Sequence, residues 1–306
     1  MADYDVLIIG AGSAGLASAL TLGRCCRRVL LADGGPPRNA ESPAVHNFLT
    51  RDGIAPAELL RLGHAQLRPY PTVETEPLAI ETLVPEGRFF RATGRRTDTD
   101  ASRSARVRRV LLATGVADVL PPLPGFRELW GRGVLHCPYC HGYEVRQQPL
   151  AVFGSGRAAV NQALLVSRWS PDVVLLTNGP PGLSDRARRQ LRRQRIAVDS
   201  RPVARLVGNP DGSVRCIEFA TGAYLERTAV FVTAAQHQRT NLAAAAGARL
   251  TSRGAVWVDK NSQTSLPGLF AAGDTSPGTQ QALLAAAQGN QAGICVHESL
   301  TREEVA

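Results

Sequence analysis

The sequence comprises 306 residues, enough for two domains of ~150 residues that each bury a core. This length excludes a mini-protein held together by disulfides. Apolar residues make up 44% and charged residues 20%, which excludes a disordered or fibrous chain. The net charge is +9, but Lys260 is the single lysine among 35 basic residues. Such an arginine bias reflects codon composition as much as function, and we do not predict nucleic-acid binding.

The cysteines and the apolar segments indicate a cytoplasmic location. Six cysteines are too few, and too unevenly spaced, for the disulfide framework of a secreted protein. The apolar stretch Val6–Gly23 follows two aspartates and is interrupted by glycines, which is atypical of a signal peptide. No other run approaches the ~18 apolar residues of a membrane span. We therefore expect a cytoplasmic protein with no membrane partner.

The N-terminal segment has the pattern of a βαβ unit. Tyr4–Ile9 is a short apolar run typical of a buried parallel strand. It leads into the GxGxxG sequence Gly10–Gly15, after which Leu16–Leu22 is predicted to be helical. A second apolar strand, Arg28–Ala32, ends at Asp33. An acid about 20 residues after the third glycine completes the dinucleotide-binding pattern.

Each residue of this turn has a separate physical role. Gly10 makes the tight turn, Gly12 lets the backbone approach a pyrophosphate, and Gly15 allows close packing of helix on strand. The N–H groups at the start of the helix are available to phosphates. The Asp33 carboxylate is suited to accept a hydrogen bond from a ribose hydroxyl, so this unit is predicted to bind a dinucleotide.

A second unit of the same kind begins in the middle of the chain. Leu150–Phe153 is a predicted strand, Gly154–Ala159 reads GxGxxA, and Ala158–Ser167 is a predicted helix that leads to the strand Val173–Leu176. The residues that follow, Thr177-Asn178-Gly179, include neither the acid that favours NAD nor the arginines that hold an NADP phosphate. The second turn is therefore predicted to keep its shape without its selectivity determinant.

The other predicted elements are assigned by apolar periodicity and by turn residues. They are the strand Val107–Leu112, the linker Pro121–Gly125, the strand Ala229–Thr233, the helix Asn241–Gly247, the strand that ends in Leu269–Asp274 and the long helix Ala282–Glu298. Two arginine-rich segments are predicted to be solvated, an exposed hairpin at Arg88–Arg109 and a helix at Ser184–Arg195.

Cys137-Pro138-Tyr139-Cys140 is the sharpest chemical signal in the sequence. A CxxC pair closes a small disulfide ring and exchanges disulfides when one thiol is partly ionised near neutral pH. Half of a zinc site is the alternative, but no second CxxC is present. Because His136 and His141 flank the pair, a local Cys2His2 site stays open as a minor alternative, although adjacent ligands crowd each other. We predict no metal.

Histidines near this pair are candidates for acid–base work. His141 directly follows the second cysteine, and its ordinary pKa of ~6.5 suits it to take and return thiol protons. The alternative is a structural histidine. His136 and His46 are weaker candidates, because nothing in the sequence fixes their direction.

Several motifs in order carry a resemblance that covers the chain. They are the GxGxxG turn, Ala113-Thr114-Gly115, Gly131–Val134 before the CxxC, the GxGxxA turn and Thr264–Asp274. This order resembles the low-molecular-weight thioredoxin reductase family. The resemblance implies an α/β fold with two Rossmann-like dinucleotide-binding domains, a homodimer and FAD. It also implies an FAD-binding domain at 1–115 and 245–306, with an inserted pyridine-nucleotide-like domain at 116–244 that carries the CxxC. The FAD contacts it implies are Gly10, Gly12, Ser13, Gly15, Asp33, Arg38, Asn47, Ala113, Gly115, Gly273, Asp274 and Gln281.

Departures from the reductase pattern favour a different activity. His141 stands where reductases usually have an acid, and Thr177-Asn178-Gly179 replaces their His-Arg-Arg cluster. The string from Cys137 to Glu144, with Arg38-Asn39 and His46–Leu49, is similar to the dithiol oxidases that close disulfides in natural products such as gliotoxin, holomycin and romidepsin.

That similarity implies catalytic Cys137, Cys140 and His141, a small-molecule dithiol substrate, and O2 as the electron acceptor that gives hydrogen peroxide. The resemblance also makes Cys137 the outer sulfur. An NAD(P)H-dependent disulfide reductase is the alternative, and a catalytically silent flavoprotein that binds a partner protein is a third. The cysteine pair argues against the third.

Overall fold

The computed structural model describes residues 2–306, and the chain divides into two compact units. Unit 1 comprises the chain up to Ala40 together with Asn47–Ala117 and Gln236–Ala306. Unit 2 comprises Asp118–Ala235 and the short upstream segment Glu41–His46, which the sequence did not indicate. Unit 1 resumes earlier than expected, because the side chains of Gln236 and Gln238 bond to residues of unit 1.

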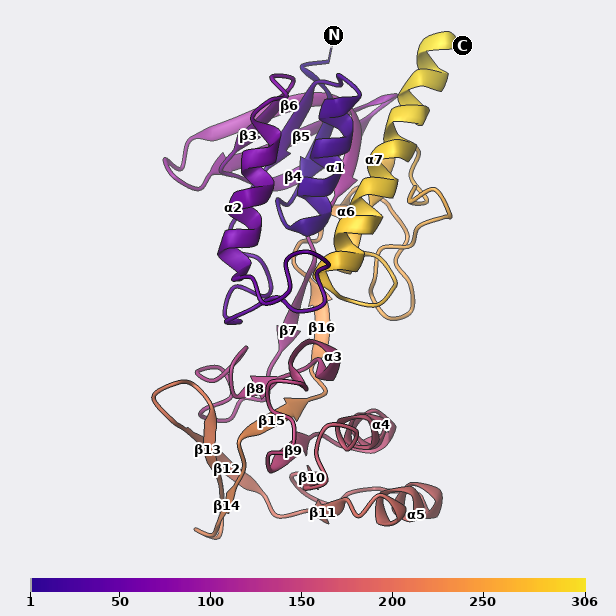
Figure 1. Cartoon of the computed structure of the whole chain (residues 1–306). Helices are drawn as coiled ribbons and strands as arrows, with labels where there is room; N and C mark the ends of the chain where they lie inside the picture. Colours follow the sequence, from indigo (N-terminus) through magenta and orange to yellow (C-terminus); the bar gives the residue numbers. More distant parts are fainter. Residues whose placement is uncertain (1) are drawn as a thin grey trace. The chain divides into compact units, whose positions relative to one another are not determined.

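A seven-stranded sheet forms the framework of unit 1 (Figure 1). Its order is β3-β2-β1-β6-β5-β4, and β17 pairs with β6. The strands β3, β2, β1, β6 and β17 run parallel, whereas β4, β5 and β6 form an antiparallel meander. The bounds are β1 (Tyr4–Ile9), β2 (Val29–Ala32), β3 (Val73–Glu76), β4 (Leu78–Glu86), β5 (Phe89–Arg96), β6 (Ser102–Leu112) and β17 (Leu269–Ala271).

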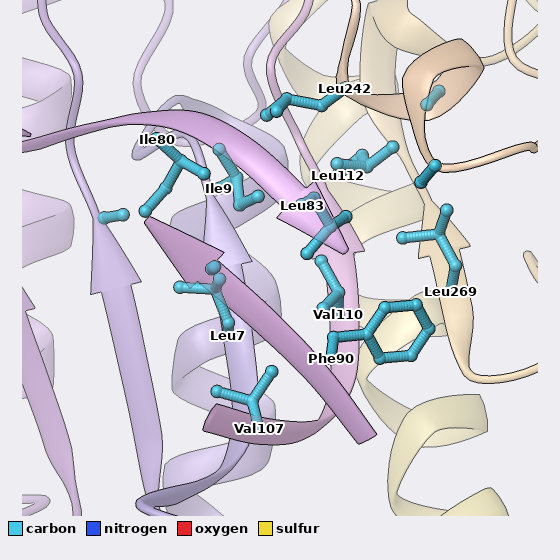
Figure 2. Close-up of a cluster of buried hydrophobic side chains, with 14 of the residues drawn as sticks. Leu7, Ile9, Ile80, Leu83, Phe90, Val107, Val110, Leu112, Leu242 and Leu269 are labelled. Carbon is cyan, nitrogen blue, oxygen red and sulfur yellow. The ribbon is translucent and has the colours of Figure 1, made fainter. Parts of the chain in front are cut away.

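Alternating residues of the parallel strands supply the cores on the two faces of this sheet. Leu7 and Ile9 of β1 pack with Phe90 of the meander and with Leu242 (Figure 2). Val6 and Ile8 pack on the other face against apolar residues of α1 and α7. The helices of unit 1 are α1 (Ser13–Arg24), α2 (Pro56–Leu67), α6 (Leu242–Ala245), the 3-10 turn η1 (Gly273–Thr275) and α7 (Ala282–Val305).

Unit 2 has a five-stranded parallel sheet of order β11-β10-β9-β15-β8 and a three-stranded antiparallel sheet β12-β13-β14. Side chains of β9 alternate between a core shared with α4 and a core shared with β12 and β13. The strands are β8 (Val134–Leu135), β9 (Leu150–Phe153), β10 (Val173–Leu176), β11 (Ala197–Asp199), β12 (Val203–Gly208), β13 (Val214–Phe219), β14 (Tyr224–Glu226) and β15 (Ala229–Val232). The helices are α3 (Pro138–His141), α4 (Gly156–Val166) and α5 (Asp185–Arg193).

The proline-rich segment Pro121–Gly125 is not the linker that the sequence predicts. The N–H of Leu206 donates to the carbonyl of Pro124 at 2.9 Å, and Leu123 packs against the core of unit 2. A Cβ on Gly125 would lie under 3.0 Å from the Leu206 backbone. The chain instead passes between the units through β7 (Val116–Val119) and β16 (Ala235–Gln238), which pair with each other. A proline-rich turn can pack as tightly as a strand when its carbonyls find donors.

The arginine-rich hairpin is present but only one of its faces is exposed. β5 and β6 pair in antiparallel register, and Phe90, Ala92, Ala105 and Val107 on their inner face are buried. Their outward arginines pair with acids, as Arg91 does with Glu86 at 2.6 Å. The period-2 burial was hidden in the sequence because Arg103 and Arg109 stand at inward positions of β6, in line with the buried Ala105 and Val107.

Glycines of α7 allow this helix to lie directly against α1. A Cβ on Gly289 would lie under 3.0 Å from the backbone of Ala14, and one on Gly293 would crowd Ser18 and Thr21. Ala292, Val296 and Leu300, at the spacing of one helical face, are fully buried in the same core. The close contact of the two helices therefore depends on the missing side chain at position 289.

We predict that Gly289→Ala destabilises unit 1 by about 1 to 3 kcal/mol, the usual cost of overpacking. The sign is diagnostic, since glycine to alanine inside a helix otherwise stabilises by about 1 kcal/mol. Gly63→Ala in α2 is the matched control, because its new Cβ would meet only the flexible end of the Leu16 side chain. Thermal unfolding followed by circular dichroism measures both. A stabilised Gly289→Ala variant would contradict the proposed packing.

Candidate functional site

The first glycine turn shows three different environments for its three glycines. Gly10 has φ 106°, and a Cβ there would lie under 3.0 Å from the Ala113 carbonyl. A Cβ on Gly15 would lie under 3.0 Å from the Gly10 carbonyl, whereas one on Gly12 would meet no atom within 4 Å. Gly10 and Gly15 are therefore required by packing. Gly12 leaves open space beside the backbone, as a pyrophosphate requires.

The helices α1, α2, α6 and α7 of unit 1 begin without a side-chain cap, and two of them start at predicted cofactor residues, α1 at Gly12 and Ser13 and α7 at Gln281. The uncapped N–H groups of a first turn carry partial positive charge and bind anions. Gly273 lies next to the start of α1, since a Cβ on it would lie 2.9 Å from the Ala14 Cβ. The structure therefore brings the GxGxxG turn and the Gly273-Asp274 segment together.

The polar residues predicted around this turn are held by local bonds. The N–H of Gly35 donates to Oδ1 of Asp33 at 3.3 Å, and Nε2 of His64 lies 3.9 Å from Oδ2. Asn47 has φ 61°, and its N–H donates to Oδ1 of Asp52 at 2.7 Å. Asp33 stands directly after the carboxyl end of β2, where a ribose is held in this type of fold.

An ion pair joins two of the predicted cofactor residues. Nη1 of Arg38 lies 3.1 Å from Oδ2 of Asp274 and donates to Oε1 of Gln280 at 2.7 Å. Gln280 in turn exchanges amide hydrogen bonds of 2.8 and 2.9 Å with Gln236. The two glutamines were missed in the sequence, because neither belongs to a motif. Gly115, also predicted here, has φ 68° at the end of the β6 segment.

The second glycine turn resembles the first at its outer positions, whereas Gly156 has φ 69° where Gly12 has φ −72°. A Cβ on Gly154 would crowd Thr233, Ala159 is fully buried, and a Cβ on Gly156 would meet nothing within 4 Å. The end of β10 differs, because Oγ1 of Thr177 donates to the Gly179 carbonyl at 2.7 Å. Oδ1 of Asn178 accepts the Val203 N–H at 2.8 Å. Both side chains therefore form hydrogen bonds to backbone groups of unit 2.

Cys137 and Cys140 form a disulfide at the carboxyl end of β8. Cys137 is the N-cap of α3, and its Sγ accepts the Cys140 N–H at 3.1 Å. Both cysteines are half-buried. A donor aimed at sulfur stabilises a thiolate, so this bond favours negative charge on Cys137 once the disulfide opens.

Burial and two neighbouring side chains, Glu144 and His46, shift the pKa of His141. Burial lowers the pKa of His141 below its ordinary value, the Glu144 carboxylate opposes this by raising the pKa, and His46 lowers it further. Nε2 of His46 lies 3.3 Å from Oε1 of Glu144. Burial therefore favours the neutral form of His141, which can accept a proton. The pairing of Glu144 with His46 was missed in the sequence, because His46 lies far upstream.

The remaining candidates are His136, which directly precedes Cys137, and the four other cysteines. His136 stacks on Trp130 with ring centroids 5.6 Å apart. Cys25, Cys26, Cys216 and Cys295 are free thiols, and burial raises the pKa of Cys295. Within residues 2–306, no group of three or more His, Cys, Asp or Glu side chains is arranged to hold a metal ion. In the same part of the chain, no helix is both long enough and apolar enough to cross a bilayer.

We predict that two substitutions move the pKa of His141 in opposite directions. Glu144→Gln removes a negative charge and lowers the pKa of His141 further, whereas His46→Gln removes the group that disfavours its protonation and raises the pKa. NMR titration of the imidazole signals measures both shifts, with His297 of α7 as an internal reference. Shifts of the same sign in both variants would contradict this electrostatic arrangement.

A comparison with known protein families assigns nearly the whole chain to one family. Residues 4–289 match the family described as pyridine nucleotide-disulphide oxidoreductase. The thioredoxin reductase tcpT of Claviceps purpurea is 32% identical over 88% of this chain and 86% of its own length. The thioredoxin reductase aclD of Aspergillus oryzae is 28% identical over 99% of this chain and 98% of its own.

Solved structures agree with these relatives. The crystal structure of HlmI is 39% identical, with a TM-score of 0.90 over 99% of this chain and 94% of its own. A structure described as a putative thioredoxin reductase TrxB from Bacillus anthracis is 31% identical, with a TM-score of 0.90 over 98% and 99%. The resemblance inferred from the sequence motifs is confirmed, as is the fold class. The chain belongs to the pyridine nucleotide-disulphide oxidoreductase family, as an FAD-dependent oxidoreductase of the thioredoxin reductase type.

Proposed function

We propose that this protein is an FAD-dependent dithiol oxidase that closes a disulfide in a small molecule through Cys137 and Cys140. The proposal assigns FAD to unit 1 and the redox pair to unit 2. O2 is the final electron acceptor and gives hydrogen peroxide. We also propose that the protein is a homodimer and that it acts in the cytoplasm. The four free thiols support the cytoplasmic location.

One observation supports the proposed direction of electron transfer, from the substrate thiols to the protein. Reduction by NADPH needs a contact for the 2′-phosphate, and a guanidinium is the usual partner. Thr177 and Asn178, at the end of β10, are hydrogen-bonded to neighbouring backbone instead. The acid that would hold the ribose of NADH is also missing at this strand end. We therefore infer that the electrons come from the substrate thiols. The similarity to HlmI supports this interpretation.

The thiol chemistry balances over two exchanges. A substrate thiolate attacks Sγ of Cys137, the disulfide breaks, and Cys140 leaves as a thiolate. The second substrate thiolate then attacks the substrate sulfur of the mixed disulfide, and Cys137 leaves. The product is a cyclic disulfide, and the enzyme holds two thiols, two electrons having passed to it. Bound FAD supplies the two-electron acceptor that restores the enzyme disulfide.

Groups of unit 2 assist both exchanges. The Cys140 N–H stabilises the thiolate of Cys137 when it leaves in the second exchange. His141, whose pKa burial lowers, takes the substrate proton in its neutral form. His46 and Glu144 set the charge around this imidazole. The catalytic roles therefore fall to Cys137, Cys140 and His141.

The residues of unit 1 fit an FAD, and Gly12→Val tests this fit. Gly12 has φ −72° and ψ −173°, a conformation open to any residue, and its new Cβ would meet no protein atom within 4 Å. We expect this variant to fold like the wild-type apoprotein and to lose FAD. Flavin released on denaturation, per chain, gives the result. Full flavin retention would exclude this position from the pyrophosphate site.

Anaerobic flavin reduction by a small dithiol and by NADPH tests the function itself. We expect the dithiol to bleach the flavin quickly and NADPH to act slowly or not at all. Cys137→Ser and Cys140→Ser should abolish the dithiol reaction, with Cys216→Ser, a free thiol on β13, as the unchanged control. In Cys140→Ser, the Cys137 thiolate can attack the cyclic disulfide product and release one of its sulfurs as a thiolate, and mass spectrometry should detect this mixed disulfide. Rapid reduction by micromolar NADPH would instead establish the reductase alternative.

A further inference from the structure

Two exposed tyrosines stand beside the disulfide. Tyr139 lies between the two cysteines and is 58% exposed, and Tyr143, four residues further, is 65% exposed. Residues four apart lie on the same side of a helical turn, and Gly142 between them continues the right-handed helical conformation. Exposed aromatic rings that gather at one place commonly mark a binding surface, since they offer large, rigid contact area.

Neighbouring side chains fix the position of each ring. Tyr139 meets Trp169 edge to face, with ring centroids 5.8 Å apart and an interplanar angle of 87°. The guanidinium of Arg146 lies 3.8 Å from the centroid of the Tyr143 ring, and its Nη1 donates to the Tyr143 carbonyl at 2.7 Å. Rings held in this way lose little conformational entropy when a ligand binds.

Trp169 is itself fixed against the turn that carries the cysteines. A Cβ on Gly142 would lie under 3.0 Å from both the Trp169 ring and the Pro138 carbonyl. The main chain also connects the two segments, because the N–H of Gln147 donates to the Trp169 carbonyl at 2.8 Å. The aromatic groups and the disulfide therefore form one rigid assembly inside unit 2.

We propose that Tyr139 and Tyr143, with Trp169 and Arg146 behind them, bind the scaffold of the substrate and select dithiols whose thiols are carried on an apolar, π-bearing ring. This inference rests on the proposed dithiol oxidase function and names its substrate class. Because Tyr139 stands between the two cysteines in the chain, we expect its ring to contact the scaffold of a substrate whose sulfur attacks the disulfide. An aromatic scaffold gains ring contacts there that an aliphatic one lacks.

The test compares two dithiols that both close a six-membered cyclic disulfide, ortho-xylylene dithiol with an aromatic scaffold and dithiothreitol without one. For Tyr139→Ser and Tyr143→Ser we expect kcat/KM to fall about 3- to 10-fold with the aromatic dithiol, the usual range of an aromatic pair. With dithiothreitol the fall should be smaller, so that the ratio of the two kcat/KM values decreases in both variants. Tyr139→Phe should keep the preference, and Tyr224→Ser, 70% exposed on β14, is the matched control.

Affinity for the cyclic disulfide of ortho-xylylene dithiol, measured by calorimetric titration, separates this inference from the proposed function. If the wild-type protein oxidised neither dithiol yet bound this product more weakly after Tyr139→Ser, the function would fail and the binding surface would stand. If Tyr139→Ser lowered kcat/KM equally for both dithiols, the ring would only support the disulfide segment. Unchanged rates and affinity in both serine variants would overturn the inference.

Discussion

The close approach of backbone to backbone at the first glycine turn is the constraint on which unit 1 depends. Gly15 packs on the Gly10 carbonyl, and Gly10 packs on the Ala113 carbonyl, at distances that exclude a Cβ. These contacts bring the start of α1 against the carboxyl ends of β1 and β6. Gly289 and Gly273 then bring α7 and its preceding turn against Ala14. Two uncapped helix N-termini therefore lie at one edge of the sheet, where a dinucleotide with its phosphates can bind.

Unit 2 repeats this frame with a different end to its second strand. A turn with open space at Gly156 is preserved, while Thr177 and Asn178 bond to their own surroundings. The disulfide follows β8, which runs parallel to β15, so it lies at the carboxyl edge of the sheet. In open α/β sheets this is the edge that carries chemistry. Loss of nucleotide selectivity and retention of the redox pair at one edge are consistent with a unit that takes electrons from thiols.

Local patterns predicted much of this fold because the relevant forces are local. β9 and β10 lie at the predicted residues, and the turns between strand and helix follow from the glycine spacing. Strand β4 was missed, since an irregularity between Ile80 and Thr82 shifts its apolar alternation. Pro121–Gly125 was mistaken for a linker, because packing against Leu206 depends on a strand that is 80 residues away. The amino-acid composition of a segment does not show which distant residues pack against it.

The candidate site was predictable only where a motif carries the chemistry. Glycines of the two turns and the cysteine pair are of this kind. The pairing of Arg38 with Gln280, and of His46 with Glu144, joins residues remote in sequence, and neither pair has a spacing that a motif could reveal. The segment Glu41–His46 shows why, because the chain leaves unit 1 for six residues and returns. The apolar periodicity of a sequence does not reveal that a short segment belongs to another unit.

The electrostatics around the disulfide make its two sulfurs unequal before any substrate arrives. Sγ of Cys137 accepts a backbone N–H at the start of α3, whereas no such donor to Sγ of Cys140 is seen in residues 2–306. A thiolate is therefore better stabilised on Cys137 than on Cys140. In the proposed reaction Cys137 leaves in the second exchange, so this donor would favour the step that closes the substrate disulfide. Burial of His141 complements this arrangement, because a neutral imidazole accepts the thiol proton on which each exchange depends.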